Sequence, residues 1–389
     1  MVSPPVYLDP VYLDNAASTA TRPEAVEAML PLLTESYGNP SGAHRMARDA
    51  RRQIDDARDI FAAGLGCEPG EVVFTAGGTE ADNLAVLGVH AHRGGTVVCS
   101  AVEHPAVLVP TQQLNGRIAP VDSMGMLDLA ALADLLDDSV SLVSVMLANN
   151  ETGVIQPLEE VADVVHEHAP NALIHTDAVQ AFPWLDVAAL AAPADLISIA
   201  SHKFGGPKGA GVLAVRGEAR VAPQMIGGGQ ERDIRSGTHN APAIVGMAVA
   251  AASTLTDLKT NGTRVGALRD RLADGLIAAI EGTTESAMDG RAADRSHKVP
   301  GSCHLCFEGI ESEALLFLLE REDILASAAS SCSSGAQDPS HVLAAMGYSR
   351  ELAAGSLRLS LGYASSETDV DRALAVIPDA VDHLRRLGS

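Results

Sequence analysis

Lysine is scarce in this chain, and one lysine stands where a free amine could do chemistry. The lysines of the sequence are Lys203, Lys208, Lys259 and Lys298. Lys203 follows the strand-like run 196–201 and precedes the glycine-rich run 204–211, where a backbone can approach a ligand closely. A lysine at the end of a strand can lose part of its hydration, which lowers its pKa and frees the amine for imine formation. Taken alone, Lys203 could equally be a solvated loop residue.

An aspartate that ends another predicted strand complements Lys203. Asp177 closes the run 173–177, and neighbouring parallel strands end at the same edge of a sheet, so we expect Asp177 and Lys203 to lie together. A carboxylate beside a pyridine nitrogen keeps that nitrogen protonated, which makes lysine-bound pyridoxal an electron sink. The pair therefore predicts pyridoxal phosphate held as a Schiff base on Lys203, although an aspartate at a strand end also often caps a helix.

A glycine-containing turn could bind the phosphate of such a cofactor. Residues 74–82 read Phe-Thr-Ala-Gly-Gly-Thr-Glu-Ala-Asp and lead from a strand into a helix that we expect to begin near Thr79. Unpaired N–H groups and the positive end of a helix dipole favour anions, so we predict that Gly77, Gly78 and Thr79 cradle the phosphate. Ordinary helix capping would explain these residues as well. No Gly-Lys-Ser/Thr follows, so this is not a Walker A loop.

The elements that must position these residues alternate between short β-rich runs and amphipathic helices. We predict strands over 72–75, 96–100, 141–148, 173–177, 196–201 and 211–215, and helices over 45–63, 80–92, 127–136 and 158–168. This alternation is typical of βαβ units, so we predict an α/β fold with a largely parallel sheet covered on both faces.

The length of the chain indicates two domains. At 389 residues it exceeds what one hydrophobic core usually serves. A long helical stretch over 241–280 leads into a segment with fewer strands, near 302–307 and 357–361. We predict a large domain over residues 1–255 and a smaller α+β domain over 256–389, on which the first residues of the chain could also pack.

Composition and charge exclude several classes of function. The formal net charge of −23 opposes binding to phosphate backbones, so we expect no nucleic-acid partner. The first sixteen residues contain prolines and aspartates instead of a basic start and an apolar stretch, which argues against a signal peptide. No apolar run approaches the ~20 residues of a membrane-spanning helix. We therefore expect a cytoplasmic protein with no membrane partner.

With these residues in place, the chain resembles the cysteine desulfurases, the NifS/IscS class of fold-type I pyridoxal-phosphate enzymes in aminotransferase class V. The resemblance extends from residues 12–17 to 357–362 and implies a seven-stranded, mostly parallel sheet in the large domain. Its motifs follow in the family's order: Gly-Asn-Pro-Ser at 38–41, Thr-Ala-Gly-Gly-Thr-Glu at 75–80, Glu-His at 103–104, Asn-Asn-Glu at 149–151, Asp-Ala-Val-Gln at 177–180, Ser-His-Lys at 201–203, Arg-Ser-Gly-Thr at 235–238 and Ser-Cys-Ser at 331–333.

The resemblance implies roles for further residues. His104 would stack on the pyridine ring and take part in proton transfer. Asn150 would bond the cofactor or the substrate carboxylate, and Arg358 would clamp that carboxylate as a bidentate fork. Gln180 would bond the phenolic oxygen of pyridoxal, and His202 would help to hold the phosphate.

Three other positions concern the phosphate. By resemblance, Thr238 would reach the phosphate of the neighbouring subunit's cofactor, which makes the enzyme an obligate homodimer with active sites at the interface. Family members often carry a phosphate-binding serine three residues before the lysine, and here that position is Ala200. Ser201 follows as a cofactor-binding candidate, although alternation along a strand would turn its side chain away from the side of Ala200.

The five cysteines are too scattered, and odd in number, for a disulfide framework. Cys332 lies in the small, polar run 326–335, where a thiol could approach the cofactor and carry a product away as a persulfide. Cys303 and Cys306 could suggest a metal motif, but residues three apart on a strand point to opposite faces. We therefore predict no metal site.

The reaction that the resemblance implies is the removal of sulfur from L-cysteine. Lys203 would remove the Cα proton, and the Cys332 thiolate would attack the substrate sulfur, giving L-alanine and a persulfide, with His104 as an acid or base. The persulfide would pass to sulfur-acceptor proteins, such as an iron–sulfur scaffold, a tRNA-thiolation protein or a cofactor-synthesis pathway. The alternatives are an aminotransferase, a selenocysteine lyase or another C–S lyase on the same fold, and a catalytically silent scaffold that binds sulfur acceptors.

Overall fold

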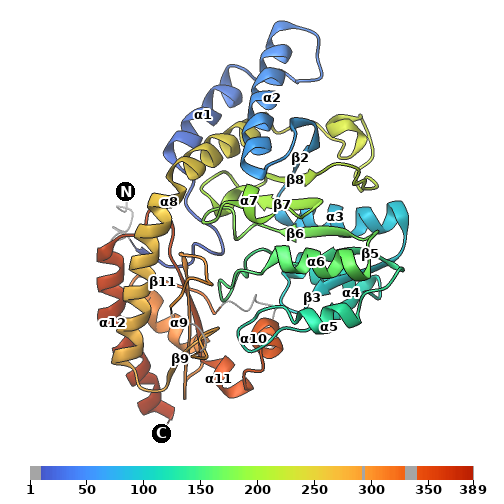
Figure 1. The fold of residues 1–389 in the computed structure, drawn as a ribbon. Coiled ribbons are helices and arrows are strands. Elements are labelled where there is room, and N and C mark those ends of the chain that lie inside the picture. Colours follow the sequence, from blue (N-terminus) through green and yellow to red (C-terminus); the bar gives the residue numbers. More distant parts are fainter. Residues whose placement is uncertain (1–9, 291–293, 329–339, 389) are drawn as a thin grey trace.

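A seven-stranded sheet forms the centre of the protein in a computed structural model that describes residues 10–290, 294–328 and 340–388 (Figure 1). The strand order is β2-β8-β7-β6-β5-β3-β4. Every neighbouring pair is parallel except those of β8, which runs antiparallel to both β2 and β7. The strands are β2 (Val72–Thr75), β3 (Thr96–Ser100), β4 (Arg117–Ala119), β5 (Val140–Ser144), β6 (Leu173–Asp177), β7 (Leu196–Ala200) and β8 (Gly211–Val215). The predicted mostly parallel sheet is confirmed.

Apolar layers cover both faces of this sheet, because alternate residues of a strand enter different cores. Val97 packs in the cluster of Leu84, whereas its neighbour Val98 packs in the cluster of Phe61. The helices that supply these layers are α1 (Pro23–Thr34), α2 (Arg45–Leu65), α3 (Gly78–Arg93), α4 (Pro105–Gln113), α5 (Leu129–Asp134), α6 (Leu158–His168), α7 (Val187–Leu190) and the first part of α8 (Ala241–Ala279).

The predicted strand over 141–148 is shorter in the structure and ends at Ser144. Residues 145–148 remain buried, and the backbone N–H groups of Val145 and Leu147 still bond to His175 and Asp177 of β6. The apolar run is therefore longer than the strand, because the chain stays in the core while it turns toward Asn150.

The remaining strands form two small sheets. β9 (Thr283–Glu285), β10 (Ser302–Phe307) and β12 (Ser356–Ser360) make an antiparallel sheet in the order β12-β10-β9. Near the N-terminus, β1 (Val11–Tyr12) pairs in parallel with β11 (Ile324–Leu325). The helices of this part are α9 (Ser312–Arg321), α10 (His341–Ala345), α11 (Arg350–Ala354) and α12 (Glu367–Gly388).

Helix α8 is 39 residues long. It contacts α1 and α2, which cover the seven-stranded sheet, and also β9, β10 and α12 in the part that contains the three-stranded sheet (Figure 1). The predicted domain boundary at residue 255 falls inside this unbroken helix and stays a prediction. By length and composition, α8 is the one described helix that could cross a membrane, which the sequence did not lead us to expect. Half of its apolar window is buried within the protein.

Candidate active site

The carboxyl ends of β6 and β7 border a cavity of about 460 Å³. Asp177 is the last residue of β6, and Lys203 ends a short 3₁₀ turn that follows β7. The predicted site residues that line the cavity are Gly78, Thr79, His104, Asn150, Asp177, Gln180, His202, Lys203 and Arg358. The structure therefore brings most of the predicted site together at one edge of the sheet.

Lys203 is held by the backbone of the N-terminal segment. Its Nζ donates hydrogen bonds to Ala16 O at 2.5 Å and to Ala17 O at 3.0 Å. Burial and the nearby charge of Arg358 lower the pKa of Lys203 from 10.5 to about 8, although Asp177 and Asp14 oppose the shift. More of the amine is therefore neutral near pH 7 than in an ordinary lysine, as imine chemistry requires.

Asp177 presents a buried carboxylate to the same cavity. Its Oδ1 accepts a hydrogen bond from Val179 N at 2.8 Å, and burial raises its pKa while the charges of His104 and Lys203 lower it. A buried carboxylate is stable only with a charged or hydrogen-bonding partner. A protonated pyridine nitrogen would be such a partner.

Asp82 and His175, which we did not predict, are buried polar residues close to Asp177. Asp82, on α3, lines the cavity and lies 3.7 Å from His175 Nε2. The imidazole of His175 also contacts Ser144 Oγ at 2.8 Å and Ser198 Oγ at 2.9 Å. Burial, together with the charge of Asp177, raises the pKa of Asp82 well above its usual value, and burial lowers the pKa of His175 to about 3.

The sequence held a signal for both of these residues. Asp82 follows Gly78 by four positions, and residues four apart share one face of a helix. His175 precedes Asp177 by two positions, so both side chains leave the same face of β6. A search of the predicted helix and strand for polar residues on the cavity face would have found them.

His104 is fixed by the start of α4, where it is the N-cap. Its Nδ1 accepts a hydrogen bond from Ala106 N at 3.1 Å. Burial lowers the pKa of His104, so the ring is neutral over a wider pH range. With Nδ1 occupied as an acceptor, the proton of the neutral ring is on Nε2, where it can be donated toward the cavity.

The other end of the cavity suits a phosphate. Helix α3 begins at Gly78, with Gly77 as its N-cap at φ 152°. A Cβ on Gly78 would lie 2.9 Å from Val179 Cγ2, so only glycine allows this close approach. The first N–H groups of a helix lack partners within the helix, so the start of α3, where Gly78 and Thr79 line the cavity, suits an anion. His202 lines the same end, and burial lowers its pKa to about 4.

Three predicted phosphate residues, Gly77, Ser201 and Thr238, do not line this cavity, although Gly77 directly precedes the lining residue Gly78. Ser201 Oγ lies against Gly206, only 2.1 Å from where a Cβ of that residue would stand, whereas Ala200 does line the cavity. The prediction that Ser201 contacts the cofactor thus finds no support, because the chain leaves the strand at Ser201 and turns its side chain away. Thr238 is exposed, in the loop before α8, and its predicted contact across a dimer stays a prediction.

Arg358 and Asn150 meet at the side of the cavity nearest β12. Arg358 is 5% exposed, and its Nη1 donates to Asn150 O at 3.1 Å. Its Nη2 donates to Asp14 Oδ1 at 2.9 Å. A buried guanidinium on the wall of a cavity is well suited to bind a carboxylate.

Cys332 lies outside the described residues. Ser327, five positions earlier, lines the cavity and exchanges backbone hydrogen bonds with Arg358. Cys303 and Cys306 are buried in different apolar clusters, which confirms that their side chains point to opposite faces of β10. In the part of the chain that the structure describes, no group of three His, Cys, Asp or Glu side chains could hold a metal ion.

These residues fit pyridoxal phosphate. The buried Oε1 of Gln180 has no hydrogen-bond partner among the described residues, and the phenolic hydroxyl of pyridoxal would donate to it. Asp177 would face the ring nitrogen, Lys203 the aldehyde carbon, and the start of α3 the phosphate. Each polar group of the cofactor thus has a complementary group in the cavity.

Comparisons with known proteins agree with this geometry. A family model described as aminotransferase class-V matches residues 11–373. An IscS-like cysteine desulfurase of Mycobacterium tuberculosis is 44% identical over 389 residues, covering 96% of this chain and 97% of that protein. A cysteine desulfurase IscS of Methanosarcina thermophila is 39% identical over 385 residues, covering 97% of this chain and 93% of that protein.

A solved structure has the same architecture. It is described as a NifS-like protein, superposes with a TM-score of 0.88 at 34% identity, and covers 96% of this chain and 100% of that chain. The likeness therefore extends over both main sheets and over the cavity between them. The chain belongs to the aminotransferase class-V family, a family of pyridoxal-phosphate enzymes.

Proposed function

We propose that the protein is a cysteine desulfurase, which converts L-cysteine to L-alanine and leaves a persulfide on Cys332. The observation that carries this proposal is the convergence of Lys203, Asp177 and Arg358 on one cavity. The chain is also similar over nearly its whole length to proteins named cysteine desulfurases.

The described residues have distinct tasks in this reaction. When bound, pyridoxal phosphate supplies the electron sink that lets an amino acid lose its Cα proton. Arg358 binds the substrate carboxylate, and the neutral amine of Lys203 takes the Cα proton onto Nζ. Asp177 keeps the proton on the ring nitrogen, and His104 donates a proton from Nε2.

Sulfur transfer balances without an added oxidant or reductant. The Sγ of Cys332 forms a bond with the substrate sulfur while the substrate Cβ–S bond breaks, and the electron pair stays with the carbon fragment. That fragment takes up protons and becomes alanine. L-Cysteine and the Cys332 thiol thus give L-alanine and a persulfide, which is a reversible thiol modification.

The test follows alanine and protein-bound persulfide together after L-cysteine is added to the purified holoenzyme. We expect the wild type to form both and Cys332→Ser to form neither. Cys67→Ser is the matched control, because Cys67 is half-buried and lies away from the cavity, and it should behave as the wild type. Undiminished alanine formation by Cys332→Ser would refute the proposal and indicate a C–S lyase that releases sulfide directly.

We also propose that the enzyme acts as a homodimer. Helix α1 carries an exposed apolar stripe at Val26, Leu30 and Leu33, which share one helical face, and Ile226 is 87% exposed. Such a surface favours burial against a second copy. The loop of Thr238, which does not line its own cavity, would then reach the partner's cofactor phosphate. Leu30→Asp with Ile226→Asp should give a monomer in sedimentation analysis, and an unchanged dimer would contradict this arrangement.

The remaining parts of the proposal concern location and partners. The enzyme would act in the cytoplasm and pass its persulfide sulfur to acceptor proteins such as an iron–sulfur scaffold. The net charge of −23 supports the expectation that nucleic acid is not a partner. Persulfide labelled with ³⁵S should move to a candidate acceptor in the presence of wild-type enzyme, and not in the presence of Cys332→Ser.

A further inference from the structure

His304 and Arg358 face each other across β10 and β12. The backbone N–H and C=O of Arg358 both bond to Ser327, at 2.7 and 3.3 Å, on the far side of β12. The carbonyl of His304 accepts from Ser286 N at 3.1 Å, on the far side of β10. His304 and Arg358 are therefore a non-hydrogen-bonded pair, with Cα atoms about 4.5 Å apart and side chains at their closest.

Each of these two side chains has one buried nitrogen with no hydrogen-bond partner among the described residues. His304 is fully buried and its Nδ1 lies 3.0 Å from Ser286 Oγ, but its Nε2 has no hydrogen-bond partner within the described part of the chain. Arg358 uses Nη1 and Nη2 on Asn150 and Asp14, and its Nε also lacks a described partner. A buried polar group that stays unpaired is costly, so a link between the two is favoured.

The neighbours of His304 make Nε2 an acceptor. The Ser286 hydroxyl lies 3.4 Å from His304 O and can donate to it, which leaves its lone pairs to accept from Nδ1–H. The neutral ring then has a bare lone pair on Nε2. Burial and the positive charges of Lys298 and Arg358 lower the pKa of His304 to about 3. A guanidinium only donates hydrogen bonds, so the neighbouring Arg358 favours a lone pair over an N–H group at Nε2 of His304.

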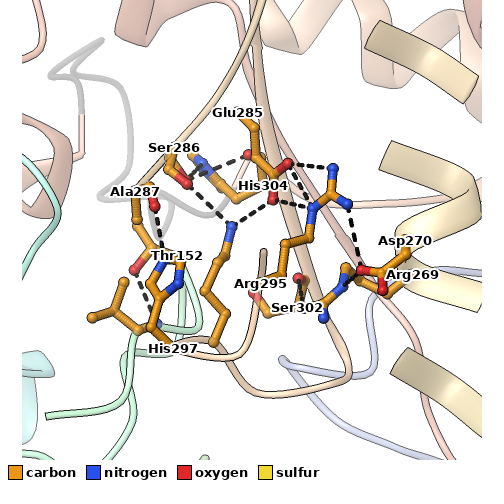
Figure 2. A network of polar contacts seen from close by, with 12 residues as sticks. Thr152, Arg269, Asp270, Glu285, Ser286, Ala287, Arg295, His297, Ser302 and His304 are labelled. Carbon is orange, nitrogen blue, oxygen red and sulfur yellow. Dashed lines mark hydrogen bonds and ion pairs between the residues drawn. The ribbon is translucent and has the colours of Figure 1, made fainter. Parts of the chain in front are cut away.

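A buried ionic network holds Ser286 in place beside His304 (Figure 2). Lys298 Nζ donates to Glu285 Oε1 at 2.8 Å and to Ser286 O at 3.1 Å. Arg295 binds the same Glu285 carboxylate, at 2.8 Å from Nη2 to Oε2. These charges fix the end of β9, and with it the Ser286 hydroxyl that sets the tautomer of His304.

The same network also supports the segment that follows Asn150. The backbone next to Lys298 pairs with this segment, since Ile155 N donates to His297 O at 2.9 Å and Val299 N donates to Gly153 O at 2.8 Å. Ser302 Oγ donates to Glu151 O at 3.2 Å. Asn150, which accepts from Arg358, and His304, which faces Arg358 across the strands, are thus held by one buried cluster.

We propose that His304 is a positioning residue for Arg358, with Nε2 accepting from Arg358 Nε–H either directly or through one bridging water. An arginine has five N–H groups. Asn150 and Asp14 take one from each Nη, and His304 takes the one on Nε. One N–H then remains on each Nη, and this end-on pair matches the two oxygens of a carboxylate. The inference deepens the proposed function, because it concerns recognition of the substrate carboxylate.

Two variants of His304 separate this role from a purely structural one. In His304→Gln the side-chain amide reaches the place of Nε2 and can still accept from Arg358. In His304→Asn the amide reaches only the place of Nδ1 and keeps the contact with Ser286. We expect His304→Asn to raise the KM for L-cysteine about tenfold with kcat within about twofold, as for a lost binding contact, and His304→Gln to restore most of the loss. A structural role through Ser286 predicts the opposite order.

A binding measurement makes the test independent of desulfuration. The visible absorption of the holoenzyme is titrated with L-alanine and with ethylamine, which has no carboxylate. We expect His304→Asn to weaken L-alanine binding about tenfold and to leave ethylamine binding unchanged. Equal losses for both ligands, no loss for L-alanine, or equal losses in the Asn and Gln variants would overturn the proposal. If Cys332→Ser still forms alanine, the proposed function fails while this titration still decides the role of His304.

Discussion

Arg358 Nη2 donates to Asp14 Oδ1 over 2.9 Å, although the two residues are 344 positions apart in the chain. Two residues further along the same N-terminal segment, the carbonyl of Ala16 accepts from Lys203 Nζ. The guanidinium that would bind the substrate carboxylate and the amine that would take its Cα proton are thus anchored on neighbouring residues. A shift of this segment would disturb both groups together.

Replacing Asp14 tests whether this anchor aids substrate binding. In Asp14→Ala the guanidinium of Arg358 loses its charged partner and can rotate, so we expect the KM for L-cysteine to rise about tenfold. Asp14→Asn keeps an acceptor oxygen and should change KM by no more than about threefold. Steady-state kinetics on both variants provides the measurement. If Asp14 instead competes with the substrate for Arg358, Asp14→Ala would lower KM.

The lowered pKa of Lys203 predicts how uptake of the cofactor depends on pH. Only the neutral amine can form the imine, and burial places the pKa of Lys203 at about 8 instead of 10.5. The rate at which apoprotein binds pyridoxal phosphate should rise about tenfold per pH unit below pH 8 and level off above it. Stopped-flow absorbance would record this profile.

A control variant checks the cause of that shift. Arg358 is the charged neighbour that lowers the pKa of Lys203. In Arg358→Gln that charge is gone, so the midpoint of the uptake profile should move to higher pH. A midpoint near 10.5 in the wild type would show that Lys203 is not buried in the apoprotein.

The buried carboxyl of Glu103 predicts a pH dependence of stability. Burial raises the pKa of Glu103 from 4.5 to about 8, so between these values the folded state holds a proton that the unfolded state has released. The free energy of unfolding should therefore fall as pH rises from about 4.5 to about 8. Glu103→Gln removes this effect. Between about pH 4.5 and about pH 8, the free energy of unfolding of the variant relative to that of the wild type should therefore rise by on the order of 2–4 kcal/mol.

Urea unfolding at pH 5 and pH 8 provides the measurement. Glutamine keeps an oxygen for the N–H of Met146 and the hydroxyl of Ser100, which both bond to Glu103 Oε1. Glu160 is exposed on α6, so Glu160→Gln is the matched control and should show no such trend. A stability difference between Glu103→Gln and the wild type that is the same at both pH values would contradict the prediction.

Ala200 and Ser201 give a direct test of the phosphate end of the cavity. Ala200 lines the cavity and its Cβ would lie 3.4 Å from a Cβ on Gly78, so Ala200→Ser would place a hydroxyl beside the phosphate. We expect pyridoxal phosphate to bind about three- to tenfold tighter, the usual gain from one hydrogen bond. Ser201→Ala should bind it as the wild type does. Equal tightening for pyridoxal, which lacks the phosphate, would rule out this contact.

Much of the fold could be predicted because buried parallel strands are continuous apolar runs. The strands β2, β3, β6 and β8 begin and end where the sequence indicated. The edge strand β4 escaped prediction because it has only three residues, two of them partly exposed. Short edge strands have neither the length nor the burial that makes a pattern visible.

The placement of Asp177 and Lys203 at one cavity could be predicted for a similar reason, since Asp177 ends β6, Lys203 follows β7, and the ends of these strands meet. The contact of Asp14 with Arg358 could not be predicted, because it depends on pairing between distant segments: Asp14 forms a β-bridge to Ser360, the last residue of β12. Strand alternation did predict that the side chain of Ser201 turns away from the side of Ala200, but it did not predict the 3₁₀ turn that starts at Ser201.

Helix α8 has a consequence for how the protein unfolds. One end packs on α1 and α2 and the other on α12 and β10, and helix formation is cooperative along its length. If the seven-stranded sheet unfolded, one half of the helix would lose its apolar contacts. The other half, on which the three-stranded sheet depends, would then be destabilised as well. We therefore expect the free energies that stabilise the two sheets to be coupled through α8.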